Sequence, residues 1–176
     1  TIMTAKILEA LGLKVGIFIN PYLYHEHEYM QVNNVPIGLR MNIRLKKEVE
    51  ELAKDVQVPE IGTITFFEKL TARALIYFVK KNVDIAVIET AMGGSFDATN
   101  VVESDVAVIG PISVDHARIL GKDRAHVAVH KAGIIKASNK KVVVGRQHED
   151  AQQVIEVAAK KQRANTSSLG KDFEVS

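Results

Sequence analysis

Three kinds of side chain that could form a metal or phosphate site follow apolar stretches of this sequence. Glu89 ends the apolar run VDIAVIE, and the pair Asp115–His116 follows a second run, DVAVIG. Lys131 comes later, within HKAGIIK. A hard cation such as Mg²⁺ prefers one or two carboxylates plus substrate phosphates, whereas histidine is a less usual ligand for it. A carboxylate, an imidazole and a lysine therefore indicate a magnesium site only if the fold brings them together.

Each of these residues also has an ordinary structural interpretation. A glutamate at the end of a strand is often a loop residue or a helix-cap partner, and a histidine after a strand is often a satisfied structural residue. Lys131 on a helix is typically solvated, and the pair Gly93–Gly94 is typical of a turn. The residue types alone leave both interpretations open.

The elements that must position these residues alternate between apolar strands and helices. Strands that are apolar on both faces are typical of a parallel sheet covered by helices on each side. Right-handed crossovers place the carboxyl ends of such strands at one edge, where ligands bind. We therefore predict an α/β fold with Glu89, Asp115 and His116 at that edge. The predicted strands are 14–19, 83–89, 105–110 and 140–145.

The helices are predicted from apolar residues that recur at helical spacing. Thr65, with Glu68 three residues later, has the capping-box pattern of a helix start, and Gly12 is a helix stop signal. Residues 20–37 are predicted to be a long loop. The predicted helices are one that ends near Gly12, then 43–56, 65–82, 122–136 and 149–163.

Composition excludes several classes of protein. The 176 residues include 23 Lys and Arg against 21 Asp and Glu, and a net charge of +2 offers no electrostatic basis for binding nucleic acid or an acidic membrane surface. The chain has no cysteine, which excludes disulfides and cysteine–zinc sites and fits a reducing compartment. No apolar run approaches the roughly 20 residues of a membrane span.

Two other groups of residues are better explained by structure than by chemistry. His25, Glu26, His27 and Glu28 could suggest a metal cluster, but they lie in a polar segment, their spacing fits no tidy ligand set, and a solvated loop is the better interpretation. The aromatic residues Phe66, Phe67, Tyr77 and Phe78 recur at helical spacing, and we expect them in the core.

Several stretches together resemble the folylpolyglutamate synthase/dihydrofolate synthase family, whose members are relatives of the Mur peptide ligases. The most specific are ETAMGGSFDATNVVESDVAVIGPISVDH and HKAGIIK; the stretches AKILEALGLKVGIFINPYL, YMQVNNVPI and TFFEKLTARALIYF are also similar. The resemblance covers nearly the whole chain. It implies a three-layer αβα fold with a mostly parallel sheet, similar to the Mur ligase central domain and to P-loop NTPases.

The resemblance also implies roles for the candidate residues. In the family, the residues in the places of Glu89 and His116 bind Mg²⁺ beside the ATP phosphates, and the lysine in the place of Lys131 carries a carbamate that is a metal ligand. Asp115 is expected, with Lys131, among the catalytic residues. The residues expected to border the pteroate pocket are Thr65, Phe66, Phe67, Glu68, Phe96, Asp97, Ala98, Thr99 and Asn100.

The implied activity is ATP-dependent amide formation with Mg²⁺ as cofactor. The carboxylate of a folate tail, or of dihydropteroate, takes the γ-phosphoryl group of ATP, and the amino group of L-glutamate attacks the resulting acyl phosphate. The family's enzymes are cytoplasmic, and we expect a monomeric parent protein whose partners are these small molecules, with neither nucleic acid nor membrane among them.

The sequence departs from the family pattern in two ways. The family's first strand and phosphate loop would precede Thr1, and its C-terminal glutamate-ligase domain would follow the end, so residues 1–176 are expected to be a partial ATP-binding domain that is inactive or nearly so alone. Several family residues are also replaced. Asn20 and Tyr22 stand in the places of Ser and His, Tyr29, Gln31 and Ser95 in the places of arginines, and His130 where Glu is common.

Two alternatives remain at this point. One is a Mur-type ligase that joins an amino acid to a precursor of peptidoglycan, although the Asp-Ala-Thr-Asn and Lys-Ala-Gly-Ile stretches argue against it. The other is a non-catalytic, decayed homologue that acts as a binding domain, which the replaced arginines and Asn20 favour.

Overall fold

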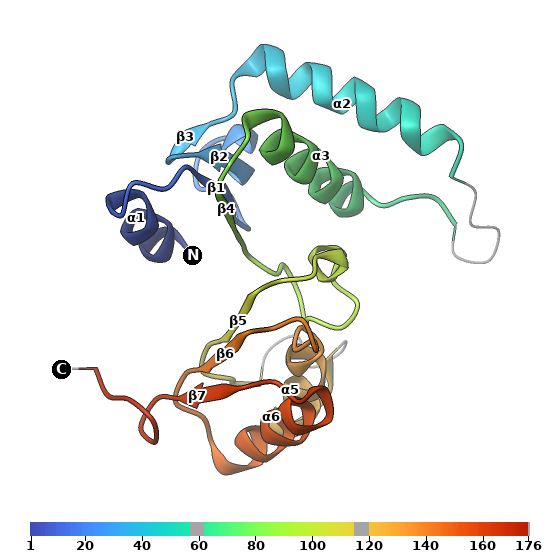
Figure 1. Cartoon of the computed structure of the whole chain (residues 1–176). Helices are drawn as coiled ribbons and strands as arrows, with labels where there is room; N and C mark the ends of the chain where they lie inside the picture. Colours follow the sequence, from blue (N-terminus) through green and yellow to red (C-terminus); the bar gives the residue numbers. More distant parts are fainter. Residues whose placement is uncertain (57–61, 115–119, 176) are drawn as a thin grey trace. The chain divides into compact units, whose positions relative to one another are not determined.

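The computed structural model of the chain describes residues 1–56, 62–114 and 120–175. These residues form two compact units, Thr1–Ala91 and Met92–Ser176, each with its own sheet, helices and core (Figure 1). In the described ranges, no helix is both long enough and apolar enough to cross a membrane.

The first unit contains a four-stranded sheet in the order β3-β2-β1-β4. The strands β1 (Val15–Phe18) and β4 (Ile85–Ile88) pair in parallel, with Val15 opposite Ile85 and Phe18 opposite Ile88. Both strands were predicted from their apolar runs, and the parallel pairing confirms that prediction. Their carboxyl ends therefore lie next to each other.

The other two strands of this sheet correct the prediction of one long loop at 20–37. The segment folds into a 3₁₀ turn, η1 (Glu26–Tyr29), and an antiparallel hairpin of β2 (Met30–Val32) and β3 (Val35–Pro36). Asn33 and Asn34 both have positive φ, 50° and 56°, as the two-residue turn of a twisted hairpin requires. The Asn33 side chain also accepts a hydrogen bond of 2.8 Å from the Val15 backbone N–H.

Helices α2 (Leu39–Lys54) and α3 (Phe66–Lys81) lie side by side in the first unit (Figure 1). Gly16 of β1 permits close packing against α3, because a Cβ there would lie 2.7 Å from the Phe78 ring. A shorter helix, α1 (Ile2–Ala10), precedes β1, and Gly12 follows it with a φ of 87°, as the predicted stop signal requires. The main buried residues are Phe18, Met30, Ile37, Leu45, Leu70, Ala74, Tyr77 and Phe78.

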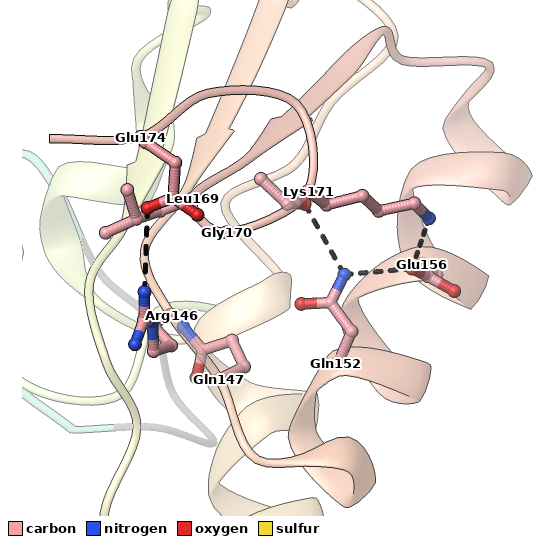
Figure 2. A pocket seen from close by; sticks show the side chains of 9 residues that line it. Arg146, Gln147, Gln152, Glu156, Leu169, Gly170, Lys171 and Glu174 are labelled. Carbon is pink, nitrogen blue, oxygen red and sulfur yellow. Dashed lines mark hydrogen bonds and ion pairs between the residues drawn. The ribbon is translucent and has the colours of Figure 1, made fainter.

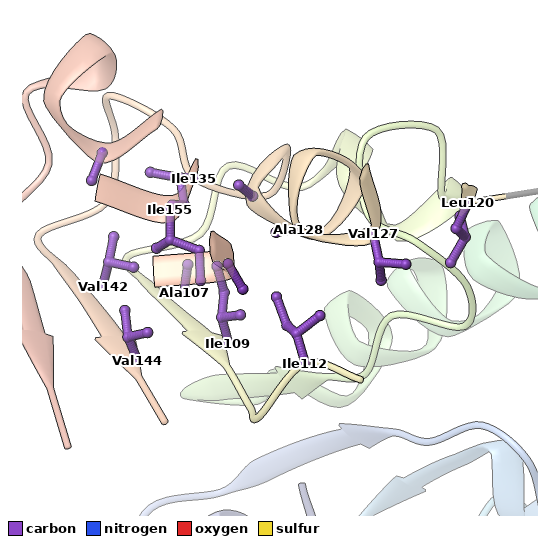
Figure 3. Packing of buried hydrophobic residues seen from close by; sticks show 13 residues of the cluster. Ala107, Ile109, Ile112, Leu120, Val127, Ala128, Ile135, Val142, Val144 and Ile155 are labelled. Atoms are coloured by element: carbon purple, nitrogen blue, oxygen red, sulfur yellow. The ribbon is translucent and has the colours of Figure 1, made fainter. Parts of the chain in front are cut away.

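The second unit contains a parallel sheet in the order β5-β6-β7. Its strands are β5 (Val106–Ile109), β6 (Lys141–Val144) and β7 (Thr166–Ser168), and its helices are α5 (Arg124–Ala132) and α6 (Glu149–Gln162). Alternate strand residues pack with one face of each helix (Figure 3). That core includes Ala107, Ile109, Val127, Ala128, Val142, Val144, Ala151 and Ile155.

Three boundaries or assignments differ from the sequence prediction. Helix α2 begins at Leu39, earlier than the predicted residue 43. The apolar pattern did not reveal this first turn, because the residue on its buried face is the polar Asn42. Helix α5 ends at Ala132 and Gly133 caps it, so residues 133–136 are not helical. Phe66 is 59% exposed, which contradicts its expected place in the core, whereas Tyr77 and Phe78 are buried as predicted.

Candidate functional site

Glu89 lies directly after β4, at the carboxyl end of the parallel pair. Its backbone N–H donates to the Phe18 carbonyl, at 2.9 Å, which extends the pairing with β1 by one step. The side chain is half-buried, and among the described residues its carboxylate has no hydrogen-bond or ion-pair partner. A carboxylate left available at this edge suits a ligand site.

Asn20 follows β1 at the same edge, and a cis peptide bond joins it to Pro21. The parallel register of β1 with β4 thus places Asn20 and Glu89 after neighbouring strand ends. Asp115 and His116, the other residues predicted at this edge, lie outside the described residues.

The loop that contains Asp97 is folded by that residue's own carboxylate. Oδ1 accepts hydrogen bonds from the backbone N–H and the hydroxyl of Thr99, at 3.0 and 2.6 Å, and Oδ2 accepts one from the Met92 N–H at 2.9 Å. These bonds cap the 3₁₀ turn η2 (Ala98–Val101). The buried Thr99 and its neighbour Ala98 are therefore part of the loop's framework, which was not apparent from their resemblance to a substrate-binding motif.

Phe96 lies in the same loop but has a different environment. Its side chain is 91% exposed, and the ring centroid lies 6.1 Å from that of His130 on α5. The two rings are tilted by 57° to each other, so the flat apolar surface on which a bicyclic aromatic ligand could stack is the exposed Phe96 ring itself.

Lys131 lies in the last turn of α5, directly under this loop. The Ser95 backbone N–H donates to the His130 carbonyl at 2.8 Å, and the Asn100 side chain donates to the Gly133 carbonyl at 3.2 Å. The Lys131 side chain is half-buried, and its Nζ has no hydrogen-bond or ion-pair partner within the described part of the chain. The second unit thus brings Lys131 and the Phe96–Asn100 residues together.

The Thr65–Glu68 segment forms the N-terminus of α3. The two residues make the predicted capping box: Thr65 Oγ1 accepts from the Glu68 N–H at 3.3 Å, and the Glu68 carboxylate accepts from the Thr65 N–H at 2.7 Å. The hydrogen bond from the Thr65 hydroxyl, followed by that from its N–H, lowers the pKa of Glu68. Phe66 points outward, and Phe67 stacks on Phe18 with ring centroids 5.8 Å apart.

Glu28, from the loop considered above for a metal cluster, also forms hydrogen bonds with backbone groups of its own segment. Its carboxylate accepts hydrogen bonds from the N–H groups of Leu23, Tyr24 and His25, at 2.8 to 3.3 Å. The bond from Leu23 contributes most to a lowered pKa of Glu28. In the residues that the structure describes, no group of three or more His, Asp or Glu side chains is arranged to hold a metal ion.

A cavity of about 410 Å³ lies in the second unit, where β6 and β7 end (Figure 2). Its charged side chains face each other: Arg146 pairs with Glu174, and Lys171 with Glu156, each at 3.6 Å. The sequence did not indicate this cavity, because the strand β7 is short and polar and lacks an apolar pattern. The lining residues are Arg146, Gln147, Gln152, Glu156, Ser168, Leu169, Gly170, Lys171 and Glu174.

Comparison with known proteins decides the family. Residues 44–175 match the model of the Mur ligase middle domain. This chain belongs to the Mur ligase middle-domain family. It is also 38% identical, over 165 residues, to the dihydrofolate synthase/folylpolyglutamate synthase of Bacillus subtilis, a match that covers 93% of the chain and 38% of that protein.

Two solved structures share the fold of this Mur ligase domain. One is the Mycobacterium tuberculosis folylpolyglutamate synthase complexed with ADP and AMPPCP, with a TM-score of 0.93 and 34% identity over 99% of this chain and 40% of that chain. The other is Escherichia coli FolC in complex with DHPP and ADP, with a TM-score of 0.86 and 31% identity over 95% of this chain and 38% of that chain.

These comparisons confirm the resemblance and the α/β fold class predicted from the sequence. The names of the matched proteins favour the folate synthases over peptidoglycan ligases. The chain spans about 40% of the length of the curated relatives it matches.

Proposed function

We propose that this chain is the ATP-binding part of a cytoplasmic, monomeric ligase that joins L-glutamate to the carboxylate of a folate or of dihydropteroate. The contact between the Phe96–Asn100 loop and the helical turn that contains Lys131 carries the proposal. It brings Lys131, expected to bind metal, together with the Phe96–Asn100 residues, expected to bind substrate, in a chain similar to nucleotide-bound synthases.

The reaction proceeds in two displacements. An oxygen of the substrate carboxylate attacks the γ-phosphorus of ATP, and ADP leaves. The amino nitrogen of L-glutamate then attacks the carbonyl carbon of the acyl phosphate; inorganic phosphate leaves, and the nitrogen loses a proton. The protein contributes by positioning the reactants and by neutralising charge.

The donor set fits a hard cation. Neither the Glu89 carboxylate nor the Lys131 Nζ has a hydrogen-bond or ion-pair partner among the described residues. A lysine ammonium repels a cation, but a neutral lysine amine that adds to carbon dioxide and loses a proton becomes an anionic carbamate. Glu89, His116 and carbamylated Lys131 would hold Mg²⁺, which supplies charge neutralisation to the phosphoryl group.

Phe96 and the capped start of α3 are proposed to border the pteroate pocket. Because the carboxylates of Asp97 and Glu68 already accept hydrogen bonds from their own segments, they act by shaping the backbone. Exposed Phe66 and Phe96 remain available for contact with an aromatic ligand.

Metal binding tests the proposal directly. Electron paramagnetic resonance measures the free Mn²⁺ remaining when the chain and AMPPCP are titrated with Mn²⁺. We expect Glu89→Gln and Lys131→Ala each to weaken binding at least tenfold. Glu51→Gln, on an exposed face of α2, is the matched control and should bind as the parent does. Equal affinity in all four proteins would overturn the metal site.

A second candidate, a binding domain without ligase activity, is favoured by two of the replaced residues. Where the family has arginines, Tyr29 packs edge-to-face on Tyr22, and Gln31 is buried and donates to the Glu28 carbonyl. Both side chains thus stabilise the loop instead of presenting charge to an anion. Binding of pteroate without any detectable Mn²⁺ or AMPPCP binding would favour this candidate.

A further inference from the structure

The loop at 92–102 and the end of α5 meet through their backbones. The His130 carbonyl accepts two hydrogen bonds from Ser95, one from the N–H at 2.8 Å and one from the hydroxyl at 3.2 Å. It also accepts one from the Gly133 N–H at 3.2 Å, which ends the helix. The peptide immediately before Lys131 is therefore tied to the loop.

Two glycines make this approach possible. A Cβ on Gly94 would lie 2.4 Å from the His130 oxygen and 3.1 Å from the Cα of Lys131. A Cβ on Gly133 would lie 2.0 Å from the Ser95 hydroxyl oxygen and 2.7 Å from the Cα of Ser95. Any side chain at either position would force the loop and the helix apart, because backbone atoms cannot rotate away.

The side-chain amide of Asn100 closes the contact from the other end of the loop. Its nitrogen donates to the Ser95 carbonyl at 3.1 Å and to the Gly133 carbonyl at 3.2 Å. Lys136 in turn donates to the Asn100 carbonyl and, at 2.8 Å, to the Val102 carbonyl. Residues on both sides of Lys131 are thus fixed to one loop.

We propose that Gly94, Gly133 and Asn100 are positioning residues that set the backbone of Lys131 and hence the direction in which its Nζ leaves the helix. The inference rests on the proposed function, in which that nitrogen forms the carbamate. Helix α5 has only nine residues and ends at Ala132, so helical hydrogen bonds alone hold its last turn weakly. The loop supplies the missing constraint.

The position of Lys131 is measured by ¹³C NMR after reductive methylation with ¹³C-formaldehyde, and the Lys131→Arg variant identifies its signal. We expect Gly94→Ala, Gly133→Ala and Asn100→Ala to shift that signal. Gly110→Ala is the matched control, since a Cβ there meets nothing within 4 Å, and it should leave the signal unchanged.

The Asn100→Ala variant only removes atoms and creates no steric overlap, so we expect it to remain folded even if the glycine variants unfold. Circular dichroism measures whether each variant is folded. A folded Asn100→Ala protein whose Lys131 signal coincides with that of the parent would overturn the proposal.

A separate, unmethylated sample in ¹³C-bicarbonate reports the carbamate itself. We expect a carbamate signal in the parent, none in Lys131→Arg, and a signal reduced several-fold in Asn100→Ala. No signal in the parent would count against the carbamate in the proposed function, while the methyl signal would still decide whether the loop positions Lys131.

Discussion

The guanidinium group of Arg73, on α3, lies 3.5 Å from the Glu26 carboxylate in η1, although only 4% of the arginine side chain is exposed. Its Nη1 donates to the Asn42 side-chain oxygen at 3.2 Å, and the Asn42 amide nitrogen lies 3.2 Å from Nδ1 of His27. This polar cluster joins the segment before the hairpin to both long helices of the first unit. Its partners come from three separate elements, so it acts as a long-range connection.

We predict that Glu26→Gln lowers the free energy of unfolding by about 1 kcal/mol, because a buried guanidinium loses its counter-charge but the half-exposed carboxylate was already screened by solvent. Arg73→Ala should cost about 3 kcal/mol, since it also removes buried packing. Urea denaturation measures both. Glu51→Gln is the control, because its ion pair with Lys54 is largely exposed and should contribute nothing measurable. If Glu26→Gln is equally neutral, Asn42 alone satisfies the arginine.

The capping box of α3 predicts a stability difference that depends on pH. Thr65→Ala should cost about 1 kcal/mol near neutral pH, because the Thr65 hydroxyl no longer accepts from the Glu68 N–H or donates to the Glu68 carboxylate. The pKa of Glu68 is lower in the folded protein than in the unfolded chain, so its contribution is present above the unfolded pKa and is lost as the pH falls through the folded pKa.

The difference between the free energies of unfolding of the parent and of Thr65→Ala should therefore narrow on acidification from about pH 6 to about pH 3, as the bond from the Thr65 hydroxyl to the Glu68 carboxylate weakens. Chemical denaturation at several pH values measures this. Thr65→Ser keeps the acceptor and should remain close to the parent throughout. A constant gap between the parent and Thr65→Ala would show that the bond from the Thr65 hydroxyl to the Glu68 carboxylate contributes nothing to stability.

How much of this fold the sequence predicts depends on how local each signal is. Strong apolar runs such as 106–109 and the Thr65–Glu68 cap are local, and both were predicted. The three residues of β2 and the polar residues of β7 are too few to show alternation, and pairing with β1 and β6 decides their structure. The Asn33–Asn34 pair was the signal for the hairpin, since asparagine tolerates positive φ.

Some features of the candidate site could likewise be predicted from the sequence, and others could not. The position of Glu89 at the edge of the sheet can be predicted, because the apolar run before it indicates a strand and parallel strands end at the same edge. The cap made by Glu68 was also predicted, from its spacing to Thr65. The role of Asp97 could not be predicted, because a carboxylate in a sequence motif looks the same whether it faces a ligand or caps its own backbone. Phe66 was placed in the core on spacing alone, but Phe67, one position later, occupies the buried face of the helix.

The hairpin turn allows conformational and hydrogen-bond contributions to be separated. Asn33→Gly keeps the positive φ but loses the hydrogen bond to the Val15 N–H, and we expect a cost of about 1 kcal/mol. Asn33→Ala loses the bond and also strains the backbone, and should cost about 1 kcal/mol more. Urea denaturation of both variants measures the two terms. Equal stability of the two variants would mean that the turn relaxes out of the left-handed region.

The exposed ring of Phe96 gives a prediction that separates binding from folding. At 91% exposure it contributes little to packing, so Phe96→Ala should leave the free energy of unfolding unchanged within about 0.5 kcal/mol. If the Phe96 ring is the proposed stacking surface, the same variant should bind pteroate at least fivefold more weakly by calorimetry, whereas Phe96→Tyr should bind normally. Val101→Ala, exposed in the same loop, controls for a general loss of apolar surface. Unchanged pteroate affinity in Phe96→Ala would place the pteroate ring elsewhere.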